Sequence, residues 1–211
     1  MARAFRRRGS GDDVRYVAHL DADEREVVAS LMEQVRGMLD SPDAPDHGDD
    51  EFGGIVAGLG IGRGDPLAGH HGDDARGEVP DGAPEARDPA LDRLLPSGNR
   101  EDEQAAAEFR RLTEPGLRHR KALALDAAVA ALQVDDTVRL DEGAARGFLT
   151  ALTDVRLVLG ERLQLRTDED LDLLEELARS LDPEDPVVHA VELYDFLTWI
   201  QETLASALLG D

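Results

Sequence analysis

Residues 186–209, PVVHAVELYDFLTWIQETLASALL, repeat their apolar side chains at the spacing of an α-helix. Apolar residues cover more than half of the circumference of this helix, so several neighbours are needed to bury it. The segment therefore predicts a helix that is central in a bundle or lies at an interface. One apolar stripe is formed by Leu193, Leu197, Ile200, Leu204 and Leu208, and Phe196 and Trp199 occupy neighbouring positions.

Helical periods also precede this segment, and most of them begin at a residue that can cap a helix. Asp21 and Glu24 have the spacing of a capping box at the start of the first helix, and Ser41-Pro42 ends it. Later helices are predicted to start at Asp88-Pro89, near residue 102, and at Asp141, Thr167 and Asp185-Pro186. Within residues 102–133, Pro115 either kinks the helix or begins a new one. The chain is predicted to be a mainly α-helical bundle.

The first twenty residues predict a small β-hairpin. Residues 5–8 and 14–20 flank a turn-rich break at residues 9–12, and the second segment alternates at the period of a strand. Because two strands alone are marginally stable, a further strand is expected to pair with them. Residues 137–140, TVRL, are the best candidate for this third strand.

Residues 41–87 are dominated by glycine, proline and aspartate and sustain no hydrophobic period. We predict that they form a long, disordered, acidic and glycine-rich loop inserted in a single domain of residues 1–211. His70 and His71 in this loop resemble metal ligands but lack the spacing that a rigid site requires. The glycine run at residues 53–64 lacks the strand and the lysine of a phosphate-binding loop. We therefore predict no metal site and no cofactor.

The chain has 46 acidic and 23 basic residues, a formal net charge of -23. Such a charge repels nucleic acid and anionic lipid, so we expect neither as a partner. The sequence shows no signal-peptide pattern and no apolar stretch long enough to cross a membrane, and cysteine is absent. We expect a soluble cytoplasmic protein, and the pattern indicates no oligomeric state.

Arginines are concentrated in the first predicted strand, at Arg3, Arg6, Arg7 and Arg8. One interpretation is a solvated edge strand, on which positive charges discourage aggregation. In the other, this basic patch meets the acidic loop of the protein itself or an anionic partner.

Residues 154–163, DVRLVLGERL, place Arg156 and Arg162 on or beside the apolar face of a helix. Their stems could extend outward, but a buried guanidinium group requires a carboxylate, for which Asp195 and Glu202 of the last helix are candidates. Asp154 and Glu161, which lie at the border of the apolar face or opposite it, are local alternatives for this carboxylate. A structural ion pair is favoured, and the alternative is a hydrolase or an anion-binding protein built on these four residues: Arg156, Arg162, Asp195 and Glu202.

No motif indicates a catalytic residue, so the leading hypothesis is a non-enzymatic interaction or regulatory protein with an unknown protein partner. Trp199 lies away from the main leucine stripe, beside polar positions, and is a candidate for contacting that partner. The alternative for Trp199 is ordinary packing against another helix.

Several blocks of the sequence resemble an actinobacterial family known as a domain of unknown function, DUF2017. They are FRRRG, RYVAHLDADE, DPALDRLLPSG, EDEQAAAEFRRLTE, LTDVRLVLGERL and LYDFLTWIQETL. Phe148 stands where tryptophan is expected, and the loop of residues 41–87 is longer than in the family pattern. The resemblance implies no activity or ligand. It implies a link to Clp-type proteolysis, because genes of this family lie beside those for a Clp protease adaptor and a metallopeptidase-like protein.

Overall fold

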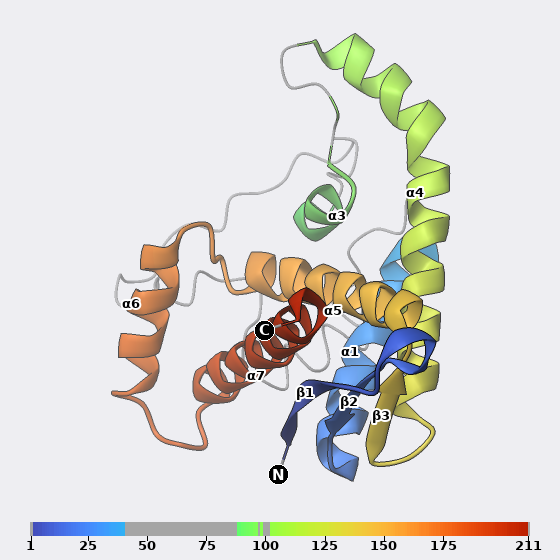
Figure 1. Cartoon of the computed structure of the whole chain (residues 1–211). Coiled ribbons are helices and arrows are strands. Elements are labelled where there is room, and N and C mark those ends of the chain that lie inside the picture. The colour runs from blue at the N-terminus through green and yellow to red at the C-terminus, as the bar shows by residue number, and fades with distance from the viewer. Residues whose placement is uncertain (1, 41–87, 97, 99–101, 211) are drawn as a thin grey trace.

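The computed structural model describes residues 2–40, 88–96, 98 and 102–210 of the chain, which form a bundle of helices with a small sheet packed on one side of it (Figure 1). The strands are β1 (Arg3–Arg8), β2 (Arg15–His19) and β3 (Thr137–Leu140), and a single 3₁₀ turn (Gly11–Asp13) joins the first two. The helices are α1 (Ala22–Asp40), α3 (Pro89–Leu94), α4 (Glu103–Leu132), α5 (Glu142–Arg162), α6 (Asp168–Ala178) and α7 (Pro186–Leu209). The predicted fold class is confirmed, including the N-terminal hairpin and the third strand at residues 137–140. The predictions for residues 41–87, including His70 and His71, fall outside the described residues.

The helices begin at the residues that the capping patterns in the sequence predicted. The Asp141 side chain accepts a hydrogen bond from the backbone N–H of Ala144 at 2.8 Å, at the start of α5. Asp21 and Glu24 form the predicted capping box, each side chain accepting from the other residue's backbone N–H. Thr167 completes a second capping box at α6. These contacts satisfy backbone donors that the first turn of a helix leaves free.

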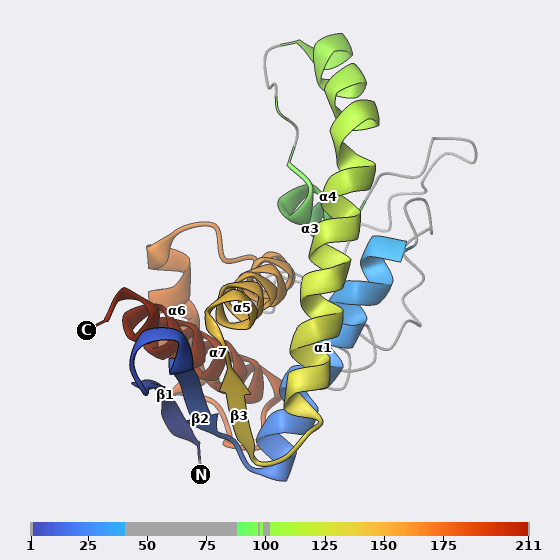
Figure 2. The same ribbon diagram turned by 45° about the vertical axis from the view of Figure 1, so that its right-hand side comes forward.

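Helix α4 is continuous, with Pro115 in its interior, so this proline does not begin a new helix. Proline has no N–H to donate within the helix, and Pro115 is exposed to solvent. Figure 2 shows that the N-terminal half of α4 extends beyond the other helices, while its C-terminal half packs beside α1 and α5.

Helix α5 lies at the centre of the bundle, in contact with α1, α3, α4 and α7. Its buried side chains include Phe148, Leu152 and Leu159. Helix α7 packs against α5 and α6 and also contacts β1. One continuous hydrophobic core therefore joins the sheet to all the longer helices. No helix in the described ranges is both long enough and apolar enough to span a membrane.

The sheet is antiparallel, in the order β1-β2-β3, and one of its faces is buried. Tyr16 pairs with Leu140 and Ala18 pairs with Val138, and all four side chains point into the core. Phe5 of β1 is also buried and packs edge-on against Phe148 of α5, with ring centres 5.8 Å apart. Because side chains alternate along a strand, the residues between these positions face outward.

Candidate functional site

Arg156 lies between α5 and α7 and is held by uncharged groups. Its Nη1 donates to Gln201 Oε1 at 3.1 Å and its Nη2 donates to the hydroxyl of Tyr194 at 3.3 Å. The guanidinium carbon also lies 5.0 Å from the centre of the Tyr194 ring, a cation–π arrangement. Among the described residues Arg156 has no carboxylate partner, and its buried Nε has no hydrogen-bond acceptor.

Arg162 is in a different environment, at the C-terminal end of α5. Its Nη2 donates to Asp88 Oδ2 at 2.5 Å, and Asp88 is the N-cap residue of α3. Because α3 packs on α5, this ion pair joins the two helices. The helical wheel had directed Arg162 towards acids of α7, but it could not show that α3 covers the end of α5.

Asp195 and Glu202, the two acids predicted to face these arginines, are exposed on α7. Neither forms an ion pair with any residue in the described part of the chain. Partial burial, together with the nearby Glu175 of α6, raises the pKa of Asp195. The structure thus does not gather Arg156, Arg162, Asp195 and Glu202 into one cluster.

Trp199 is half-buried and packs against the core. Its ring stacks on that of Phe196, with centres 6.1 Å apart and an angle of 20° between the planes. This geometry provides packing for one side of the indole. A role for Trp199 in binding a partner stays a prediction.

Sequence reasoning missed one buried ion pair, between Lys121 of α4 and Asp154 of α5. Asp154 is 1% exposed, the one charged residue this deeply buried among those described, although the helical wheel placed it at the border of the apolar face. A signal was present in the sequence, because Lys121 lies four residues from both Leu117 and Leu125 on the inner stripe of α4. Burial raises the pKa of the Asp154 carboxyl, and Lys121 partly opposes this effect.

The outward face of the sheet concentrates positive charge. The strand register brings Arg3 beside His19, Arg6 beside Val17 and Arg8 beside Arg15, while Arg139 of β3 lies on the other side of Val17. We define the outer sheet face as Arg3, Arg6, Arg8, Arg15, Val17, His19, Thr137 and Arg139. The sequence located the arginines of β1, but the register was needed to add those of β2 and β3.

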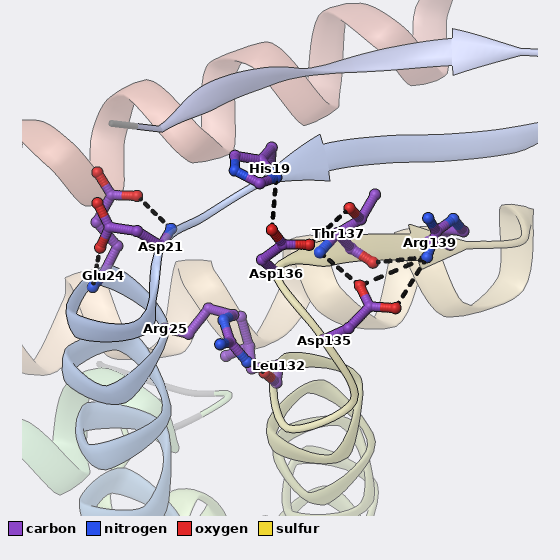
Figure 3. A network of polar contacts seen from close by, with 9 residues as sticks. All are labelled: His19, Asp21, Glu24, Arg25, Leu132, Asp135, Asp136, Thr137 and Arg139. Carbon is purple, nitrogen blue, oxygen red and sulfur yellow. Dashed lines mark hydrogen bonds and ion pairs between the residues drawn. The ribbon is translucent and has the colours of Figure 1, made fainter.

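Acidic partners of the outer sheet face lie at one of its ends. Figure 3 shows this end, where His19 Nδ1 is 3.6 Å from Asp136 Oδ2 and Arg139 Nη1 is 3.1 Å from Asp135 Oδ2. The corner is fixed by the backbone N–H of Leu20, which donates to the Asp136 carbonyl at 2.9 Å.

Unlike His19 and Arg139, the β1 arginines of the outer sheet face have no acidic partner among the described residues. The side chains of Arg3, Arg6 and Arg8 are exposed, and none has a hydrogen-bond or ion-pair partner among the described residues. They line a surface hollow of about 510 Å³ together with Val17, His19 and Thr137. Guanidinium groups in such a position can form bidentate hydrogen bonds with carboxylate or phosphate oxygens.

The fold and this face define a small helical-bundle protein that carries a basic three-stranded sheet on an otherwise acidic chain. The chain belongs to the family described as a domain of unknown function, DUF2017, whose model matches residues 2–208. The match confirms the resemblance to DUF2017 itself. No curated protein and no solved structure matches the chain.

Proposed function

We propose that this protein is a non-enzymatic protein-interaction module that binds an acidic segment of a protein partner on its outer sheet face. The observation that carries the proposal is the group of three exposed arginines, Arg3, Arg6 and Arg8, which surround one hollow and have no acidic partner within the described part of the chain. The chain has a net charge of -23, yet these three arginines lie close together on a single strand. Carboxylates of a partner would complete their hydrogen bonding.

A protein partner fits this face better than a nucleic acid does. The net negative charge of the chain repels a polyphosphate at long range. The outer sheet face also has no phenylalanine, tyrosine or tryptophan, whereas sheets that bind single-stranded nucleic acid use such rings to stack bases. An acidic peptide needs no stacking surface.

The proposal includes a cytoplasmic location and a link to Clp-type proteolysis. The absence of cysteine is compatible with a reducing compartment. The proteolytic link is supported by the family resemblance alone, and it gives the first partners to test, namely the Clp protease adaptor and the metallopeptidase-like protein.

Charge reversal on the face tests this function. A variant with Arg3→Glu, Arg6→Glu and Arg8→Glu is compared with a matched variant carrying Arg110→Glu, Arg111→Glu and Arg120→Glu on α4, which has the same change in net charge. Each is used to capture partners from a native lysate at low and high salt, with quantification by mass spectrometry. We expect specific acidic proteins to be lost from the first variant and retained by the second. Equal capture by both variants would refute the basic face as the binding surface.

Arg156 supports a second candidate function, the binding of a small anion between α5 and α7. The specific observation is a guanidinium group that has no carboxylate partner among the residues the structure describes and whose buried Nε has no hydrogen-bond acceptor there. If an anion binds there, inorganic phosphate raises the melting temperature of the wild type and leaves that of Arg156→Gln unchanged. The same shift in both proteins would exclude this site.

A further inference from the structure

Strand β1 forms an open edge of the sheet and is bordered by a second hollow. Within the described sheet β1 pairs with β2 on one side, and no strand pairs with its other side. On that side a hollow of about 610 Å³ separates β1 from the last turns of α7. We define this edge hollow by its lining residues, which include Phe5, Arg6, Arg7, Glu202, Ser206 and Ala207.

A hydrogen bond joins α7 to the free edge of β1. The backbone N–H of Phe5 donates to Thr203 Oγ1 at 3.3 Å, so the side chain of α7 takes the place of a neighbouring strand there. Beyond this point the residues that line the hollow are small, namely Ser206 and Ala207 of α7 and Gly210, which caps the end of this helix. An added strand lies about 4.8 Å from its neighbour and needs small residues beneath it, which this part of α7 supplies.

The charge on β1 determines which strand this edge accepts. Arg3, Arg6, Arg7 and Arg8 are all exposed. A second copy of the chain that paired through β1 would place arginine opposite arginine, which is unfavourable. A strand that carries carboxylates on the same face gains cross-strand ion pairs instead.

We propose that an acidic segment of the partner binds in extended form along the free edge of β1, as a fourth strand of the sheet. This inference rests on the proposed function and specifies its binding mode. Alternate side chains of the added strand are acidic and lie on the outer sheet face beside Arg6 and Arg8. The side chains between them are small and face the edge hollow, over Ser206 and Ala207. The recognised sequence is therefore an alternation of acidic and small residues, not a continuous acidic run.

The pattern is tested with two synthetic peptides of identical composition and the full-length protein. One peptide alternates glutamate with threonine, and the other has all its glutamates grouped at one end. Binding is measured by fluorescence anisotropy at physiological salt. Because grouped acids cannot all reach the arginine side of one strand, we expect the alternating peptide to bind about tenfold more tightly.

The backbone pairing is tested separately, by N-methylation of every second residue of the alternating peptide. In one of the two registers the methyl groups remove the N–H groups that point at β1, and binding is expected to weaken by about fivefold for each lost hydrogen bond. The other register leaves those donors intact, and its affinity is expected to remain within about twofold of the parent peptide. Equal effects in both registers would overturn the fourth-strand mode.

A charge swap controls for misfolding. An Arg6→Glu, Arg8→Glu variant is expected to lose the glutamate peptide and to gain a peptide that alternates lysine with threonine, which an unfolded protein would not do. Equal binding of the grouped and alternating peptides would refute binding as a fourth strand. The proposal that the outer sheet face binds acidic segments would still stand. Absence of binding by every acidic peptide would overturn the strand, and the proposed function would fail with it only if the Arg3, Arg6, Arg8 reversal also leaves partner capture unchanged.

Discussion

Lys121, the only lysine of the chain, donates a hydrogen bond to Asp154, which is almost completely buried between α4 and α5. The second carboxylate oxygen of Asp154, Oδ2, is buried without a hydrogen-bond partner among the described residues. Removing two charges from water is costly, and one ion pair returns only part of that cost. The pair therefore constrains how α4 and α5 fit together more than it stabilises them.

Breaking this pair on one side is expected to destabilise the protein. Asp154→Leu leaves the ammonium group of Lys121 without its carboxylate, and we predict a loss of about 3 kcal/mol in the free energy of unfolding, the lower end for a broken buried pair. The lower end applies because Lys121 is still 15% exposed and can reach water. The double variant Lys121→Met, Asp154→Leu is expected to regain wild-type stability or exceed it. Urea denaturation of the wild type, the two single variants Asp154→Leu and Lys121→Met, and the double variant measures the coupling, and additive effects would show that the two groups do not interact.

Titration of Asp154 is expected to contribute to the pH dependence of the free energy of unfolding. Burial raises the pKa of its carboxyl, with Lys121 acting in the opposite direction, so the folded state keeps the proton to a higher pH than the unfolded state does. The contribution of Asp154 to the free energy of unfolding is thus greatest below the ordinary aspartate pKa, falls as the pH rises through the raised folded-state pKa, and then stays constant. The wild-type value minus that of Asp154→Asn is expected to decrease over this range. An increase with pH would mean that the ion pair outweighs desolvation.

The starts of the helices and the three strands could be predicted from sequence because their causes are local. Asp141 caps α5 through an N–H three residues away, and Asp88 caps α3 through Ala90. The surroundings of α5 could not be predicted in the same way. A helical wheel assumes one buried face, whereas α5 is covered by α1, α3, α4 and α7, and this is why Asp154 is buried.

In the candidate site, too, the features with local causes could be predicted from the sequence and those that depend on tertiary packing could not. The arginines of β1 are visible in the sequence, but their position beside His19 and Arg15 depends on the pairing of β1 with β2. For Arg156 the sequence indicated contact with α7 but not the neutral acceptors, Gln201 and Tyr194. Which side chain meets which across two helices depends on the rotation and offset of both helices, and no local pattern encodes these.

Replacing Pro115 is expected to stabilise α4. The backbone N–H that alanine restores can donate to the carbonyl of Arg111 one turn earlier, and the proline ring no longer crowds that carbonyl. Because Pro115 is exposed and the helix already accommodates it, we predict that Pro115→Ala increases the free energy of unfolding by about 1 kcal/mol, well below the full penalty for an interior proline. Thermal and urea unfolding measure the change, with Thr113→Ala as a nearby control. A loss of stability would mean that the proline sets a bend that the packing of α4 requires.

Arg162→Met tests whether the arginines of α5 have a structural role. Asp88 uses one carboxylate oxygen to cap α3 and the other to accept from Arg162, so this substitution leaves the cap and removes the ion pair. Both side chains are partly buried, 24% and 13% exposed, and a hydrogen bond between charged groups of this kind contributes about 1.5 to 3 kcal/mol. We expect that loss in urea denaturation, together with faster amide exchange in residues 90–94. Arg179→Met, which removes an exposed pair on α6, should cost less than about 0.5 kcal/mol and serves as the control. If Arg162→Met unfolds like the wild type but loses a ligand or a partner, the role of Arg162 is functional and the structural assignment is wrong.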